Sequence, residues 1–169
     1  MRLLAVAAFA VALACTDCRA AGTLHHPAWD LALDGDWALQ ARDDPEQQTA
    51  SSTALDIGLT TSFLPLNVKL AGVEPLARKF QDIRLRTEHE TGVRFHRTVT
   101  VDAPALAPAP GGYLLTYGGH DDTGRHFRFY GRVTQRGVLS LYVESSSRNE
   151  SELAAAMDRV VAGLAQRPD

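Results

Sequence analysis

Cysteine is scarce in this sequence and confined to one short stretch. Cys15 and Cys18 are the two cysteines of the 169-residue chain. A disulfide within residues 19–169 is therefore excluded, even in a compartment that would permit one. The pair does form a C-x-x-C redox motif. Such a motif needs a helix N-terminus after a strand to lower the thiol pKa, and no strand pattern precedes it, so a redox role is disfavoured.

An excess of positive charge is also lacking. The chain carries 17 Lys and Arg against 20 Asp and Glu, which gives a formal net charge of −3. Binding to nucleic acid needs a concentrated positive field, and peripheral binding to anionic lipid needs a basic cluster. Both function classes are disfavoured. The apolar and charged fractions of 45% and 22% are ordinary for a globular protein, and the length suits one domain.

The N-terminal apolar run is too short to span a membrane. Leu3 to Leu13 is uninterrupted and follows the positive start Met1-Arg2. A membrane span needs about 20 apolar residues, whereas this run has the length of the central region of an export signal. We therefore expect residues 1–21 to be a signal peptide and the protein to be periplasmic.

Two cleavage positions compete in this leader. Ala12-Leu13-Ala14-Cys15 resembles the lipobox of bacterial lipoproteins, although Ala12 replaces the usual leucine. Cleavage there predicts lipidation of Cys15 and an anchor in the outer membrane. The alternative follows Cys18-Arg19-Ala20, a small-x-small run interrupted by arginine. That cleavage predicts a free domain without cysteine.

Strand and helix patterns alternate along the rest of the chain. Residues 22–28 are expected to be a tether, and residues 29–169 a single domain. Asp34-Gly35 lies between two alternating apolar segments, a pattern typical of a hairpin. The expected elements, in chain order, are strands at 29–33, 37–41 and 55–59, a helix from Glu74-Pro75 to before Gly92, strands at 93–101, 113–117, 127–133 and 138–143, and a helix from Asn149 or Ser151 to Leu164. Residues 102–112 are expected to be a loop. This order predicts an α+β fold, with an antiparallel sheet of about six strands and two main helices packed on it.

The element order resembles a known fold family. It places a Trp-containing strand near the start, a run of strands at Arg125–Gly131 and Leu139–Ser146, and a long closing helix. It is similar to the Mog1p/PsbP-like fold, which includes the DcrB-like periplasmic lipoproteins of bacteria. The resemblance implies a non-catalytic binding or assembly factor, and related small exported domains serve as immunity proteins against toxins. The resemblance does not assign a functional role to any residue of this chain.

Catalytic chemistry has little support in the sequence. No Gly-x-Ser-x-Gly elbow and no Gly-rich phosphate loop in a strand-to-helix context is present, so neither a catalytic residue nor a cofactor is predicted. His120, Asp122 and His126 form the stretch richest in potential metal ligands. They support the alternative hypothesis of a small metal-dependent or hydrolytic enzyme. Gly, His and Asp at a hairpin tip also serve turn formation, which is the favoured interpretation.

Protein binding is the leading hypothesis. Arg128, Tyr130 and Arg132 alternate along one expected strand, and Tyr142 lies on the next. Arg and Tyr are enriched in the residues that dominate protein–protein affinity. We expect these four residues to contact a partner. The partner would be an envelope protein or a secreted toxin, and membrane contact would come only through the lipid anchor.

Overall fold

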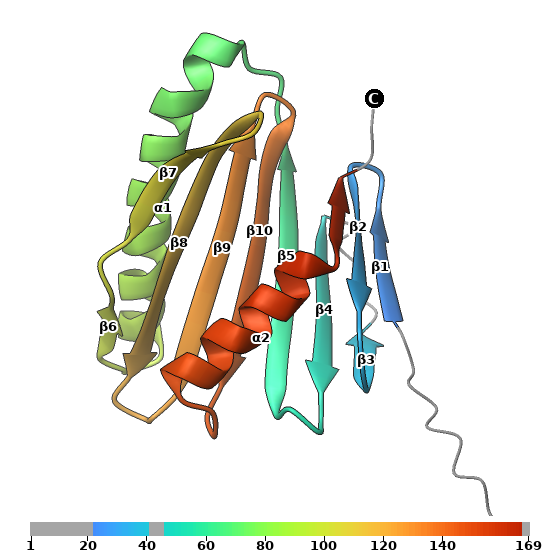
Figure 1. Cartoon of the computed structure of the whole chain (residues 1–169). Coiled ribbons are helices and arrows are strands. Elements are labelled where there is room, and N and C mark those ends of the chain that lie inside the picture. Colours follow the sequence, from blue (N-terminus) through green and yellow to red (C-terminus); the bar gives the residue numbers. More distant parts are fainter. Residues whose placement is uncertain (1–21, 41–45, 167–169) are drawn as a thin grey trace, which may run out of the picture.

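The computed structural model describes residues 22–40 and 46–166, which form two antiparallel sheets and two long helices (Figure 1). The expected signal peptide and the lipidation of Cys15 lie outside these residues. The strands are β1 (Gly22–His26), β2 (Trp29–Leu33), β3 (Trp37–Gln40), β4 (Gln47–Ser52), β5 (Ile57–Pro65), β6 (Val99–Val101), β7 (Ala105–Ala109), β8 (Gly112–Asp121), β9 (His126–Thr134), β10 (Gly137–Ser145) and β11 (Leu164–Gln166). The helices are η1 (Leu70–Gly72), α1 (Val73–Arg94) and α2 (Glu150–Ala162).

The larger sheet has eight strands in the order β3-β4-β5-β10-β9-β8-β6, with β7 also pairing with β8. The smaller sheet has three strands in the order β1-β2-β11. The predicted α+β class with two helices on antiparallel strands is confirmed. The predicted sheet of about six strands is wrong, because the large sheet also contains β4 and β7 and the small sheet contains β1 and β11. These four segments carry too little alternating apolar pattern to be recognised as strands.

The two faces of the large sheet are covered differently. On one face, the front, α2 and the small sheet share a single apolar core with the large sheet, built around Trp29, Leu59, Leu141 and Leu153. On the opposite face, the back, α1 packs through Phe80 against Phe129 of β9 and also contacts β6, β7 and β8. Figure 1 shows α1 behind the β8 side of the sheet and α2 in front of it.

The expected tether at residues 22–28 is instead part of the fold. β1 pairs along its whole length with β2, and Leu24 and His26 are buried. The His26 ring stacks on Trp29, with ring centroids 5.3 Å apart. A segment with two histidines and a proline resembles a linker in composition, but its two buried side chains close the edge of the core.

The Asp34-Gly35 pair does not close a hairpin. β2 pairs with β1 and β11, whereas β3 pairs with β4 in the other sheet. Gly35 has φ of 112°, a conformation that favours glycine. The Asp36 carboxylate accepts hydrogen bonds from the Ser52 hydroxyl and the Ala54 amide. The turn therefore crosses between the sheets and is fixed to the β4–β5 connection.

Both long helices begin close to the expected residues. α1 starts at Val73 but continues past Gly92 to Arg94. Gly92 lies where a Cβ atom would be only 2.8 Å from the Arg97 carbonyl and from Val99, so this glycine permits close packing and does not end the helix. The expected strand at 93–101 is therefore reduced to β6, and the expected loop at 102–112 contains β7. Within the described residues no helix is both long enough and apolar enough to cross a membrane.

Candidate functional site

The four predicted partner-binding residues do not share one face. Tyr130 of β9 lies opposite Leu141, whereas Tyr142 lies opposite Phe129. Arg128, Tyr130 and Arg132 therefore point to the front face, and Tyr142 points to the back. Alternation along β9 correctly predicts that Arg128, Tyr130 and Arg132 share a face. The register between β9 and β10 puts Tyr142 on the opposite face.

The three front-face residues are largely engaged within the domain. The Arg128 guanidinium lies 3.6 Å from the Glu150 carboxylate at the start of α2. Tyr130 packs against the main core, and Arg132 Nη2 donates to the Pro110 carbonyl at 2.8 Å. α2 packs directly on β9. This face therefore offers a partner less surface than the sequence suggested.

Tyr142 belongs to a half-buried polar network on the back face. Its ring stacks on Phe127, with centroids 5.5 Å apart, and Arg125 Nη1 lies 3.5 Å from its hydroxyl. Burial raises the pKa of Tyr142 far above its usual range. Arg125 also pairs with Asp121 at 2.9 Å and with Glu144 at 2.5 Å. The phenol is therefore a neutral structural group at neutral pH.

A surface that no described helix covers lies beside this network. We call it the open face; it consists of the back-face positions of β3, β4 and β5 together with Ser140 of β10. Pairing register assigns them to that face: Ala38, Gln40, Gln47, Thr49, Ser51, Gly58, Thr60, Ser62, Leu64 and Ser140. No described helix packs on these positions, because α1 lies over β6 to β9. Apart from Thr49, which is buried, they are half-buried or exposed.

The open face carries no charged side chain at any of these positions. A typical soluble surface is about a quarter to a third charged. Depletion of charge marks the centre of protein–protein interfaces. Small hydroxyl side chains supply adaptable hydrogen bonds in antibody binding surfaces. The charged cluster of Arg97, Arg125 and Glu144 lies at one end of this surface and lines the recess shared with Ser51 and Gly58.

The residues of the alternative enzyme hypothesis do not assemble a metal centre. His120 and His126 face each other across the β8–β9 hairpin, with ring centroids 5.7 Å apart. Asp122 is exposed in the turn, where its amide donates to the Thr98 carbonyl. Among the described residues no group of three His, Cys, Asp or Glu side chains is placed to hold a metal ion. The favoured interpretation of these residues as part of a turn agrees with this geometry.

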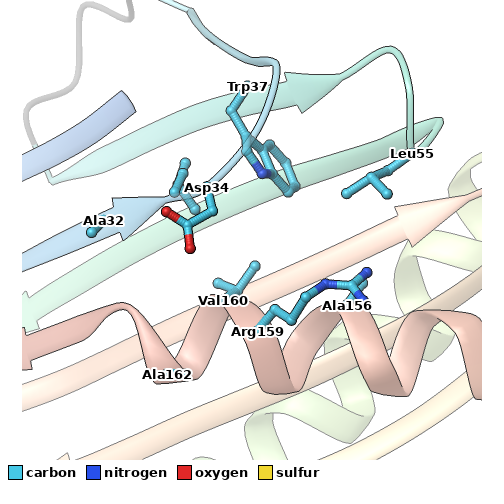
Figure 2. Close-up of a pocket in the computed structure, with 9 residues that line it drawn as sticks. Ala32, Asp34, Trp37, Leu55, Ala156, Arg159, Val160 and Ala162 are labelled. Atoms are coloured by element: carbon cyan, nitrogen blue, oxygen red, sulfur yellow. The ribbon is translucent and has the colours of Figure 1, made fainter. Parts of the chain in front are cut away.

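A small cavity lies between the two sheets and α2 (Figure 2). Its lining residues come from β2, the following turn, β3, the β4–β5 connection and α2: Ala32, Leu33, Asp34, Trp37, Leu55, Ala156, Arg159, Val160 and Ala162. We call it the Trp37 cavity. The sequence suggested only a turn at Asp34, because the cavity depends on β2 and β3 entering different sheets.

Neither a family model nor a curated protein matches this sequence. Among solved structures, the solution structure of cyanobacterial PsbP (CyanoP) from Synechocystis sp. PCC 6803 is similar, with a TM-score of 0.61 and 8% identity over 83% of this chain and 87% of that chain. The fold is therefore PsbP-like, as predicted. A crystal structure from Bacteroides thetaiotaomicron VPI-5482 has a TM-score of 0.46 and 10% identity over 83% of this chain and 46% of that chain, which is too low to support a shared fold. The predicted relation to DcrB-like lipoproteins stays a prediction.

Proposed function

We propose that this chain is an exported, non-enzymatic binding protein of the bacterial envelope that acts by protein–protein contact. The observation that carries the proposal is the open face: a surface of Ser, Thr and Gln side chains, free of charge and not covered by a described helix. An immunity factor for a secreted toxin and an assembly factor are the two roles that fit such a surface. The PsbP-like fold is compatible with both.

The contact surface differs from the one proposed from sequence. Tyr142 borders the open face, whereas Arg128, Tyr130 and Arg132 lie on the other side of the sheet. In the proposal, Tyr142 and the cluster of Arg97 and Glu144 form the polar rim of the interface, and Thr60 and Ser62 lie near its centre. The side chains of Arg97 and Glu144 are 38% and 43% exposed, so both are accessible to a partner.

Site-specific photocrosslinking in the native cells tests the contact. A photoreactive phenylalanine analogue at Thr60 or Ser62 is expected to give an adduct of one discrete mass. The same analogue at Lys79, an exposed position on α1, is the matched control and is expected to give none. The double variant Thr60→Arg/Ser62→Glu, with the analogue at Ser51, is expected to lose the adduct. Equal labelling from Thr60 and Lys79, or none from the open face, contradicts the proposal.

Export and anchoring are a separate part of the proposal. Lipidation of Cys15 would leave residues 16–21 before β1, a segment that spans at most about 20 Å. The β1 end of the domain would then lie close to the membrane surface. Mass spectrometry of the mature N-terminus tests this: a lipid-modified Cys15 supports the anchor, and a terminus near Ala21 supports a free periplasmic domain. An unprocessed Met1 contradicts export.

A further inference from the structure

The Trp37 cavity has an apolar interior of defined size. Its most buried walls are Leu33, Trp37, Ala156 and Val160, each less than 8% exposed. Its volume of about 150 Å³ is close to that of an apolar protein cavity known to hold one benzene molecule. The interior therefore accepts a phenyl or isobutyl group but not a drug-sized ligand, which needs about 300 Å³ or more.

Two exposed groups of opposite charge also line this cavity. Asp34 comes from the turn after β2, and Arg159 comes from α2. Figure 2 shows the Asp34 carboxylate on the strand side, above Val160, and the Arg159 side chain on the helix side. Among the described residues no ion pair joins them. The cavity thus combines an apolar interior with a separate anion and cation.

The turn that carries Asp34 is tied to the β4–β5 connection. Gly35 permits the sharp crossing, and the Asp36 carboxylate is tied to Ser52 and Ala54 of the β4–β5 connection. These hydrogen bonds keep the pKa of Asp36 below its usual range, first through Ser52 and then through Ala54. The strand-side wall is therefore in place before a ligand arrives, which limits the entropy cost of binding.

The geometry points to a binding site for a free α-amino acid with a medium-sized apolar side chain, such as leucine or phenylalanine. Such a molecule carries an ammonium, a carboxylate and an apolar group on one carbon atom. The apolar group fills the space beneath Trp37, Asp34 accepts hydrogen bonds from the ammonium, and Arg159 donates to the carboxylate. Charge-assisted bonds of this kind are roughly twice as strong as neutral ones. This site is on the front face and is independent of the open face.

Calorimetric titration of the full chain with L-leucine and L-phenylalanine tests the proposal. A dissociation constant of about 1 mM or tighter is expected. Isopentylamine and 4-methylpentanoate, which each lack one charge, are expected to bind about tenfold more weakly. The uncharged N-acetyl-leucine amide is expected to bind more weakly still. Equal affinity for leucine and its uncharged analogue overturns the proposal. The absence of leucine binding at about 10 mM, tenfold above the expected dissociation constant, also overturns it.

Variants separate the two kinds of contact. Asp34→Asn and Arg159→Gln are each expected to weaken leucine binding about tenfold, whereas Asp158→Asn, an exposed neighbour on α2 that does not line the cavity, leaves it unchanged. Ala156→Leu fills the cavity and is expected to abolish binding. Because this change also perturbs the core, its thermal midpoint is measured in parallel. Unaltered affinity in both charge variants overturns the proposal whatever the outcome for Ala156→Leu.

Discussion

The Tyr117 hydroxyl of β8 donates a 2.8 Å hydrogen bond to the Glu88 carboxylate of α1, in the interior between helix and sheet. Arg84 Nη2 donates to the same oxygen at 2.7 Å, and its guanidinium lies 4.7 Å above the centre of the Phe129 ring. Glu88 is 4% exposed. Burial raises the pKa of Tyr117 far above its usual range, so the phenol stays a donor. This triad fixes α1 on the covered half of the sheet and thereby defines the edge of the open face.

Removing Glu88 is expected to be strongly destabilising. Glu88→Ala removes the buried carboxylate that accepts from both Arg84 and the Tyr117 hydroxyl, and leaves them only the 3.3 Å hydrogen bond from Arg84 Nε to that hydroxyl. We therefore expect a loss of about 2–4 kcal/mol in the free energy of unfolding. Tyr117→Phe removes two hydrogen bonds, the one donated to Glu88 and the one accepted from Arg84 Nε, and is expected to cost about 1–3 kcal/mol. Urea denaturation measures both. Glu90→Ala, an exposed change on the same helix, is the control and is expected to change stability by less than about 0.5 kcal/mol. A cost for Glu88→Ala equal to that of the control contradicts this account.

Asp121 is expected to make stability sensitive to acid. Burial alone would raise its pKa, but hydrogen bonds from Thr123 and Arg125 outweigh burial and hold the pKa well below its usual range. Because an unfolded aspartate titrates near about 3.9, the stabilising contribution is complete above about pH 4 and is lost as pH falls further. Asp121→Asn is therefore expected to cost about 2 kcal/mol at pH 7 and less at pH 3, measured by urea denaturation at each pH.

The neighbouring carboxyl provides the control for this pH dependence. Asp122 is exposed, so Asp122→Asn is expected to change stability by less than about 0.5 kcal/mol at either pH. The difference in the free energy of unfolding between the parent chain and Asp121→Asn is expected to shrink from pH 7 to pH 3. A difference that stays constant over this range contradicts the proposed role of Asp121.

Local pattern was enough to predict the centre of the fold. β9 alternates strictly between buried and half-buried positions, and β10 does so from Leu139 onward, because one face of each meets an apolar core and the other carries polar groups. The start of α2 was also predictable, since Asn149 and Glu152 satisfy the free amides at a helix start. These features depend on residues close together in sequence, and the prediction was correct for that reason.

The functional surfaces could not be predicted in this way. Asp34-Gly35 favours a turn, but nothing in the local pattern states that β2 and β3 enter different sheets, and the Trp37 cavity exists only because they do. The open face has a faint sequence signal, in that Thr60 and Ser62 flank the buried Thr61. Whether a helix covers such a face depends on where α1 packs, which involves contacts between distant segments. The sequence grouped Tyr142 with Arg128, Tyr130 and Arg132 for a similar reason, since the register between β9 and β10 decides which face each residue lies on.

The N-terminal cap of α2 is expected to contribute measurably to stability. Asn149 Oδ1 accepts a 3.0 Å hydrogen bond from the backbone N–H of Glu152, and the Glu152 carboxylate accepts a 3.0 Å hydrogen bond from the backbone N–H of Asn149. Asn149→Ala is expected to lower the free energy of unfolding by about 1 kcal/mol, as seen in thermal or urea denaturation. Asn149→Asp keeps the acceptor and is expected to restore most of this loss. Equal losses in the alanine and aspartate variants would rule out capping as the cause.

Trp29 offers a test of what an unmade hydrogen bond costs in this core. Its side chain is 2% exposed, and its indole Nε1 has no hydrogen-bond partner among the described residues. Trp29→Phe loses some packing volume but removes the unpaired N–H group, whose burial costs about 1–3 kcal/mol. The two effects oppose each other, so we expect a net change within about 1 kcal/mol. Trp29→Ala leaves a large cavity beside His26 and is expected to cost about 3–5 kcal/mol. If Trp29→Phe and Trp29→Ala lower the free energy of unfolding by similar amounts in urea denaturation, the indole N–H group is hydrogen-bonded in solution. The whole indole ring is then needed for stability.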